Sequence, residues 1–198
     1  MNKKKQRIFI ITGAPGVGKT TVSALLASKL SALHVDLGQL VIKEKLTSGK
    51  DDKRETLIAD MKEASKRVTK IFEETKGDIV LDGHYAVYVV PAERVSRVFV
   101  LRRNPMELKP ILESRGWNGM KLWENLAAEV LDVCLTDAIS QCGEGKVCEI
   151  DVTERTAEDV VTGILQIIED NRKCYIGLVD WLTFLELQGR LDEFLKDW

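Results

Sequence analysis

The sequence predicts an α/β fold in which helices cover both faces of a parallel five-stranded sheet. Five short apolar runs have the length of buried strands, namely residues 8–11, 33–35, 79–82, 98–101 and 147–150. Segments with apolar residues at helical spacing separate these runs, and strands that alternate with helices form parallel sheets. A glycine-rich loop follows the first run and leads directly into a helical segment. With 198 residues, the chain suits one compact domain.

The glycine-rich loop has a specific pattern. Residues 13–20 read Gly-Ala-Pro-Gly-Val-Gly-Lys-Thr, which matches the phosphate-loop motif Gly-x-x-x-x-Gly-Lys-Thr. Glycines let the backbone turn its N–H groups inward around phosphate oxygens, and the next helix points its positive dipole end at the same place. Lys19 adds a positive charge for the β- and γ-phosphates of ATP, and Thr20 offers a hydroxyl to Mg²⁺. The strand before the loop and the helix after it favour a phosphate-loop NTPase over an ordinary glycine turn.

The segment after the loop predicts a second substrate site. The first helix is expected to end near residue 31, and the next strand ends at an edge that faces the ligand crevice in such sheets. We interpret His34 as a core or edge histidine rather than a ligand. Residues 40–76 have a helical pattern, and the polar stretch 48–52 divides them into two helices, which predicts a helical flap. Arg54 could grip a substrate phosphate there, although such charged runs usually form a solvated surface.

A carboxylate ends the strand at residues 79–82. In phosphate-loop proteins a strand-terminal Asp holds Mg²⁺ directly or through water, so Asp82 is expected close to the Thr20 hydroxyl. His84 follows two residues later. This histidine either orients an attacking water or the nucleotide, or is an ordinary loop residue, and the sequence leaves both interpretations open.

The remainder of the chain predicts a lid and a helical tail. A helix at residues 105–114 is followed by two glycines in a short turn with Arg115 at its root, which is typical of a lid that closes over phosphates. A single long helix is expected at residues 121–138. Residues 174–198 have the pattern of two amphipathic helices, which usually pack on their own domain and less often bind a partner.

Charge and cysteine content limit the class of protein. The net charge of −2 gives no electrostatic footprint for nucleic-acid binding. Because the cysteines form no C-x-x-C pair and no histidine lies at metal-ligand spacing, we interpret them as reduced interior residues rather than a disulfide or zinc framework. They are Cys134, Cys142, Cys148 and Cys174. No apolar stretch reaches membrane-spanning length, so we expect a soluble, cytoplasmic protein, or a nuclear one in a eukaryote.

Several of these motifs together resemble the adenylate kinase isoenzyme 6 family, adenylate-kinase-like proteins implicated in small ribosomal subunit assembly. The similarity covers about residues 7–170 and looks like that of a prokaryotic or archaeal-type member. The family's Asp-x-His looks like Asp82-Gly83-His84, and its Pro-Glu-Arg segment looks like residues 91–94 with one extra residue. The most specific stretch is similar to the family's arginine, short lid and following helix: Val100-Leu101-Arg102, Arg115-Gly116-Trp117, Lys121, Glu124-Asn125 and Ala128-Glu129.

The resemblance implies an ATP-dependent nucleoside monophosphate kinase that converts ATP and AMP into two ADP, with slow ATPase activity and a small-subunit ribosomal protein as partner. The expected core spans residues 1–170, with a monophosphate-binding flap at about 36–59, a lid at about 114–124 and a C-terminal helical extension at 171–198. The candidate ATP-binding residues are Gly13, Gly16, Gly18, Lys19, Thr20, Thr21, Arg102, Arg115 and Arg155. The candidate acceptor-binding residues are Asp36, Leu37, Gly38 and Arg54. The catalytic candidates are Lys19, Asp82, His84 and Arg115, with Thr20 and Asp82 for Mg²⁺.

Two other functions stay open at this point. One is a phosphate-loop kinase of another small molecule. The other is a nucleotide-switched ribosome assembly factor with little kinase activity. The lid favours the latter, because it supplies Arg115 with Lys121 behind it, whereas ordinary adenylate kinases bring several arginines.

Overall fold

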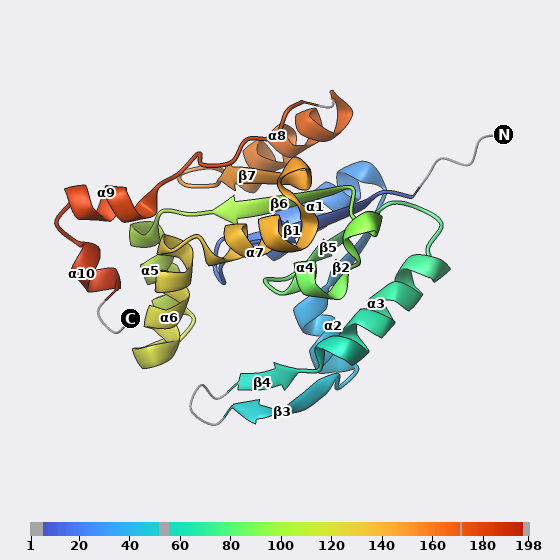
Figure 1. Cartoon of the computed structure of the whole chain (residues 1–198), viewed down its shortest axis with the longest axis horizontal. Coiled ribbons are helices and arrows are strands. Elements are labelled where there is room, and N and C mark those ends of the chain that lie inside the picture. Colours follow the sequence, from blue (N-terminus) through green and yellow to red (C-terminus); the bar gives the residue numbers. More distant parts are fainter. Residues whose placement is uncertain (1–5, 52–55, 171, 196–198) are drawn as a thin grey trace.

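The computed structural model describes residues 6–51, 56–170 and 172–195, so Arg54 lies outside the described residues. Its centre is a five-stranded sheet with strand order β2-β5-β1-β6-β7, and all of its strand pairs are parallel (Figure 1). The strands are β1 (Ile8–Thr12), β2 (Leu33–Asp36), β5 (Ile79–Asp82), β6 (Arg97–Arg102) and β7 (Val147–Asp151). The predicted fold class is confirmed, and each apolar run forms the strand expected of it.

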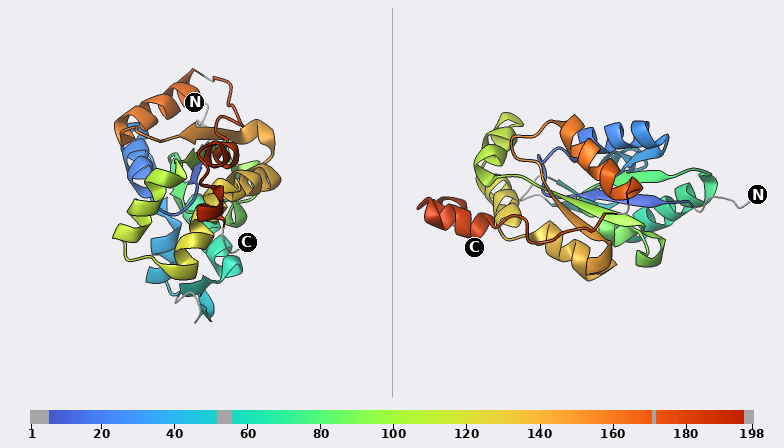
Figure 2. Two further views of the ribbon diagram at one scale, coloured as in Figure 1. Left: turned by 90° about the vertical axis from the view of Figure 1, so that its left-hand side faces the viewer. Right: turned by 90° about the horizontal axis from the view of Figure 1, so that it is seen from above.

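Helices cover both faces of this sheet (Figure 2). Alternate residues of β1 enter two separate apolar clusters, with Phe9 and Ile11 in one and Ile8 and Ile10 in the other. The helices that contribute buried residues to the Phe9 cluster include α1 (Lys19–Leu30) and α8 (Ala157–Glu169). Those of the Ile8 cluster include α3 (Met61–Glu74), α4 (Ala86–Val89) and α7 (Val133–Cys142). Because both faces are covered, the strands read as continuous apolar runs rather than alternating ones.

Two arms extend beyond the carboxyl ends of the strands (Figure 1). One consists of α2 (Leu37–Lys43) and an antiparallel hairpin of β3 (Thr47–Asp51) and β4 (Thr56–Ala59). The expected pair of helices joined by a polar turn is therefore wrong in this part. The sequence of β3 is Thr-Ser-Gly-Lys-Asp, which has no apolar periodicity, and pairing with β4 organises it.

The second arm consists of α5 (Pro105–Ser114) and α6 (Gly119–Val130). The single helix expected at 121–138 is divided into α6 and α7, because Asp132 adopts a left-handed conformation with φ of 56°. Aspartate tolerates this conformation better than most residues, and its carboxylate pairs with Arg102. Short 3-10 helices η1 (Ala92–Arg94) and η2 (Glu144–Lys146) complete the connections between the larger elements.

The C-terminal extension forms the two expected helices, α9 (Trp181–Leu187) and α10 (Leu191–Phe194). They pack on their own domain, since Leu185 and Phe194 are fully buried in the cluster of Phe9. The Lys109 ammonium of α5 pairs with Glu193 at 2.7 Å and lies 5.0 Å from the Trp123 ring centre of α6. The tail is thereby attached to the arm of α5 and α6, which contains the expected lid residues and is called the lid arm.

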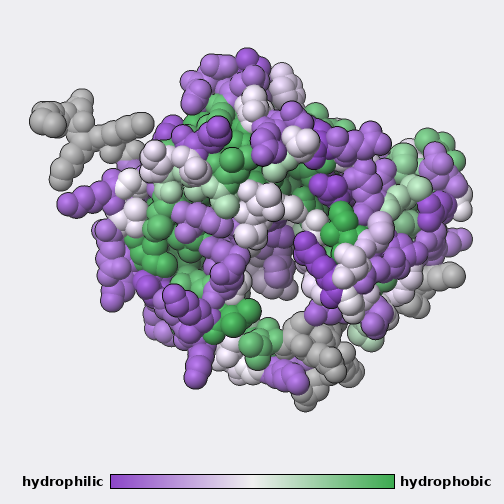
Figure 3. Space-filling model, turned by 180° about the vertical axis from the view of Figure 1, so that it is seen from behind, coloured by the Kyte–Doolittle hydropathy of each residue, from purple (hydrophilic) through white to green (hydrophobic). Residues whose placement is uncertain are grey.

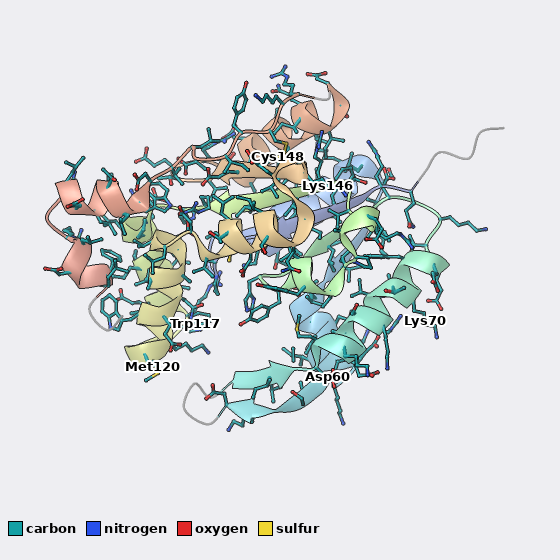
Figure 4. All side chains as sticks on the ribbon, viewed as in Figure 1. Asp60, Lys70, Trp117, Met120, Lys146 and Cys148 are labelled. Carbon is teal, nitrogen blue, oxygen red and sulfur yellow. A yellow bond between two sulfur atoms is a disulfide. The ribbon has the colours of Figure 1, made fainter. Side chains whose placement is uncertain are left out.

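The interpretation of all four cysteines as reduced is wrong for one pair. Cys148 of β7 and Cys174 of the tail form a disulfide, whereas Cys134 and Cys142 are free (Figure 4 labels Cys148). The segment after α8 runs beside β7, where the Glu149 amide donates to the Tyr175 carbonyl at 3.0 Å. This approach joins residues 26 positions apart, which cysteine spacing alone does not reveal.

None of the helices in the described residues combines the length and the apolar character that a membrane span requires.

Candidate active site

The phosphate loop lies between β1 and α1, and two of its glycines lie where a side chain would not fit. Gly13 has φ of 137°, and a Cβ there would collide with the carbonyl oxygen of Leu101. Gly16 has φ of 90°, and a Cβ there would approach Leu108 and Leu112 of α5 to 2.9 Å. Gly13 and Gly16 therefore serve both the backbone conformation and the close packing of the loop against β6 and α5.

Lys19 is held inside this loop. Its ammonium donates to the carbonyls of Gly13 and Ala14, both at 2.9 Å. Burial lowers the pKa of Lys19, and the nearby Asp82 charge partly opposes that change. The ammonium thus rests against neutral carbonyls, and a phosphate bound in the loop would supply the full negative charge that it lacks.

Asp82 ends β5 next to the phosphate loop, as expected. The β1–β5 register pairs it with Ile11, one residue before the end of β1, and the residue is only 2% exposed. Its Oδ2 atom accepts a hydrogen bond from His34 Nε2 at 2.8 Å. His34, interpreted from the sequence as a core or edge histidine, lies on the edge strand β2. Its partner could not be identified from sequence because the two residues are 48 positions apart.

The oxygen atoms at this end of β5 and α1 are of the kind that coordinates Mg²⁺. This ion prefers oxygen ligands and usually takes one or two from the protein, with phosphate and water supplying the others. The Thr20 hydroxyl at the start of α1 and the free carboxylate oxygen of Asp82 fit that requirement. Thr21, like Thr20, is exposed at the same helix start. Within the described part of the chain, no cluster of three His, Cys, Asp or Glu side chains could hold a metal ion independently.

His84 lies where two cavities meet. Its ring contacts the Tyr85 ring at an interplanar angle of 47°, with ring centres 3.7 Å apart. Although the residue is exposed toward the cleft, desolvation by surrounding groups and the Lys19 charge lower the pKa of His84 to about 4. The imidazole is therefore neutral near pH 7 and can accept a hydrogen bond. His84 lines both of these cavities.

The first cavity is a cleft of about 600 Å³ between the two arms. It is bordered by Pro15 of the phosphate loop, Leu57 of the hairpin, and Trp117 and Lys121 of the lid arm. Figure 3 shows the molecule hollowed between these arms, and Figure 4 shows Trp117 on the lid arm opposite the hairpin. The cleft is therefore open to the loop that is expected to bind ATP.

The second cavity is a smaller, apolar pocket of about 270 Å³ beneath the hairpin. Leu37 and Gly38, two of the candidate acceptor-binding residues, are among those that line it. It shares three lining residues with the large cleft: Leu57, His84 and Tyr85. The two cavities thus adjoin at the end of β5, as a donor site and an acceptor site for group transfer would.

The two cationic residues of the expected lid, Arg115 and Lys121, lie on different elements. Arg115 caps α5, is exposed, and lies close enough to affect the Lys19 pKa. Lys121 lies on α6 with its ammonium 4.5 Å from the Trp117 ring centre, and both side chains line the cleft. Within the lid expected at about 114–124, residues 115–118 form the turn between α5 and α6.

Arg102 does not face a nucleotide, contrary to expectation. It is 1% exposed, and its guanidinium pairs with Glu129 at 2.9 Å, with Glu149 at 2.6 Å and with Asp132. Burial raises the pKa of Glu129 to about 7 despite the donors around it, which include Trp181 Nε1 at 3.0 Å. Arg102 therefore joins β6, β7, α6 and the tail in one buried network and has no surface to offer ATP.

Two further candidates have other partners. Arg155 donates to the carbonyls of Asp151 and Asp159, both at 3.1 Å, and lines a cavity between α8 and the tail. Asp36 caps α2 by accepting a hydrogen bond from the Gln39 amide at 2.9 Å, and it borders a groove beside β2 rather than the acceptor pocket. Asp36 ends β2 and Arg155 lies in the loop after β7, but the sequence pattern could not indicate where their side chains point.

Comparisons with known proteins agree with this geometry. A family model described as "AAA domain" matches residues 9–132. The chain is 40% identical over 171 residues to "Putative adenylate kinase" of Methanocaldococcus jannaschii, and this match covers 86% of this chain and 90% of the relative. It is 35% identical over 189 residues to the protein of the same name from Saccharolobus islandicus strain Y.G.57.14, covering 96% and 95%.

The chain belongs to this adenylate-kinase-like family. The resemblance noted from the motifs is thereby confirmed, and it extends over most of the chain. Among solved structures, the fold is similar to that of thymidylate kinase from Candida albicans, with a TM-score of 0.56 and 18% identity over 84% of this chain and 92% of that one. That likeness supports the phosphate-loop kinase fold of the family and says nothing of substrate.

Proposed function

We propose that this protein is a nucleoside monophosphate kinase that transfers the γ-phosphoryl group of ATP to AMP and also hydrolyses ATP slowly. The observation that carries the proposal is the pair of adjoining cavities. The large cleft opens to the phosphate loop, and the small apolar pocket contacts it at Leu57, His84 and Tyr85. An apolar pocket suits a nucleobase, and the shared border would place the monophosphate next to the donor phosphates.

Positioning and charge neutralisation do most of the work in phosphoryl transfer. We assign Lys19 and the loop amides to the β- and γ-phosphates, and Arg115 to the transferring group. Thr20 and Asp82 would hold Mg²⁺, which when bound neutralises phosphate charge. Neutral His84 would orient the attacking water in the acceptor-free reaction. Arg54 stays the candidate for the acceptor phosphate, outside the described residues.

An acceptor panel tests this proposal. ADP release from ATP is measured with each of the four common nucleoside monophosphates and without acceptor. The expected result is a large stimulation by AMP over the acceptor-free rate. Stimulation by none of the four, in a protein that hydrolyses ATP, would contradict the kinase assignment, and stimulation by another monophosphate would change the acceptor.

The lid supports a second candidate function, a nucleotide-switched assembly factor for the small ribosomal subunit. Of the lid's two cations, Lys121 is engaged with the Trp117 ring, which leaves Arg115 as the exposed charge at the lid root. A weakly charged lid suits slow turnover. An ATPase rate that rises with a small-subunit ribosomal protein but not with AMP would favour this function over the first.

A further inference from the structure

His34 and Asp82 form a side-chain pair built by the sheet itself. In the β2–β5 register His34 lies opposite Val80 and Asp36 lies opposite Asp82. Residues two apart on a strand point to the same face, so the His34 ring and the Asp82 carboxylate share the α1 side of the sheet. The ring reaches two residues forward to place Nε2 at 2.8 Å from Oδ2.

The pair has the burial expected of a positioning contact. The Asp82 side chain is 3% exposed, and the His34 side chain is 24% exposed. A buried carboxylate needs hydrogen-bond donors. The Nε2–H group of histidine is such a donor, both in the imidazolium ion and in the neutral tautomer that is protonated at Nε2. The contact uses Oδ2, and no described residue donates a hydrogen bond to Oδ1.

We propose that His34 is a positioning residue for Asp82. By holding Oδ2, it keeps the carboxylate in one orientation and leaves Oδ1 free for the Mg²⁺ that accompanies the nucleotide. Partners that orient metal-binding side chains typically affect metal affinity by about 10- to 100-fold when removed. The inference rests on the proposed Mg²⁺–ATP site but not on the identity of the acceptor.

The test compares variants that keep or lose the donor. His34→Gln retains an amide that can reach Oδ2, His34→Leu has no donor, and His34→Asn is polar but too short. Leu33→Ala is the matched control, because Leu33 is the neighbouring β2 residue, is 42% exposed and points to the other face. ATP affinity is measured by calorimetry in excess MgCl₂ and again in EDTA, together with thermal unfolding.

In the folded His34→Leu variant, ATP affinity should fall about tenfold in MgCl₂ while affinity in EDTA is unchanged. His34→Gln and Leu33→Ala should behave like the unaltered protein. If His34→Leu fails to fold, His34→Asn must show the same selective loss. A double variant with Asp82→Asn should lose little beyond Asp82→Asn alone, because both changes remove one interaction.

Three results would overturn the inference: unchanged affinity in MgCl₂, equal losses in MgCl₂ and EDTA, or additive losses in the double variant. These results are distinguishable from failure of the proposed function. That failure would appear in the unaltered protein, as absence of ATP binding or of Mg²⁺-dependent binding. An unaltered protein that binds Mg²⁺–ATP but does not phosphorylate AMP leaves the inference testable and changes only the reaction.

Discussion

Replacing Arg102 with Met should destabilise the fold while leaving ATP binding almost intact. The guanidinium contacts Glu129 and Glu149, whose side chains are 1% and 0% exposed. Removing one partner of such a buried pair strands charge in the interior and costs about 3–5 kcal/mol. For a domain of this size that loss lowers the Tm by about 10 °C. Urea unfolding followed by tryptophan fluorescence measures it, with Arg103→Met as the neighbouring control.

Arg103 pairs with Glu107 at 2.8 Å, but both side chains retain solvent contact, at 19% and 31% exposure. The control should therefore lose no more than about 1 kcal/mol. If Arg102→Met remains within about 1 kcal/mol of the original stability and loses ATP affinity instead, the buried-network argument is wrong. The nucleotide role that the sequence suggested for Arg102 would then be correct.

The loss in Arg102→Met should also depend on pH. Burial raises the pKa of Glu129 from 4.5 to about 7, while Arg102 opposes that rise. Between pH 4.5 and about pH 7, Glu129 is protonated in the folded state and ionised in the unfolded state. The free energy of unfolding therefore falls as the pH rises through this range. Without Arg102 the pKa of Glu129 rises further, so the stability difference between variant and original protein should be larger at about pH 8 than at about pH 5. A pH-independent difference would contradict this account of Glu129.

Four other substitutions test the site. Lys19→Ala should abolish ATP turnover without lowering stability, since it removes an ammonium held by loop carbonyls rather than core volume, and turnover measured beside thermal unfolding checks this. Asp82→Asn should weaken Mg²⁺-dependent turnover more than Mg²⁺-free nucleotide binding, and equal losses would indicate a structural role. His84→Ala should lower acceptor-free ATP hydrolysis more than transfer to AMP, because the monophosphate brings its own nucleophile, and parallel loss in the two assays would remove the water-orienting role. Trp181→Phe should cost about 1 kcal/mol in urea unfolding through the lost bond to Glu129, and a fall in ATP affinity would count against a purely structural tail.

The central sheet and the phosphate loop could be predicted because their signals are local. Five apolar runs specify strands that are buried on both faces, and one glycine motif specifies a loop in which Gly13 and Gly16 leave no room for a side chain. Strand β3 carries no such signal, since its mostly exposed polar residues gain their strand conformation from pairing with β4. The break between α6 and α7 depends on the Asp132 carboxylate reaching Arg102, a contact across 30 positions.

The direction of the side chains explains the remaining differences between the predicted site and the observed one. Lys19, Asp82, Leu37 and Gly38 lie where the motif and strand ends placed them. Arg102 also ends a strand, but three carboxylates hold it in the interior. A sequence shows that an arginine follows a strand, whereas the acidic partners come from α6, the α6–α7 turn and β7. The same reasoning applies to His34, whose function depends on the register between β2 and β5.

The buried position of Arg102 bears on how the expected lid can work. A buried arginine that joins the end of β6 to Glu129 of α6 fixes the base of the lid arm, and Trp181 of the tail attaches to the same carboxylate. The charges that border the cleft must then come from residues nearer the lid turn, where Arg115 is exposed and Lys121 lines the cleft. A fixed base with few cations at the tip is compatible with both proposed functions, the kinase and the assembly factor. This is why the ratio of AMP-dependent to acceptor-free turnover, rather than either rate alone, distinguishes the kinase from the assembly factor.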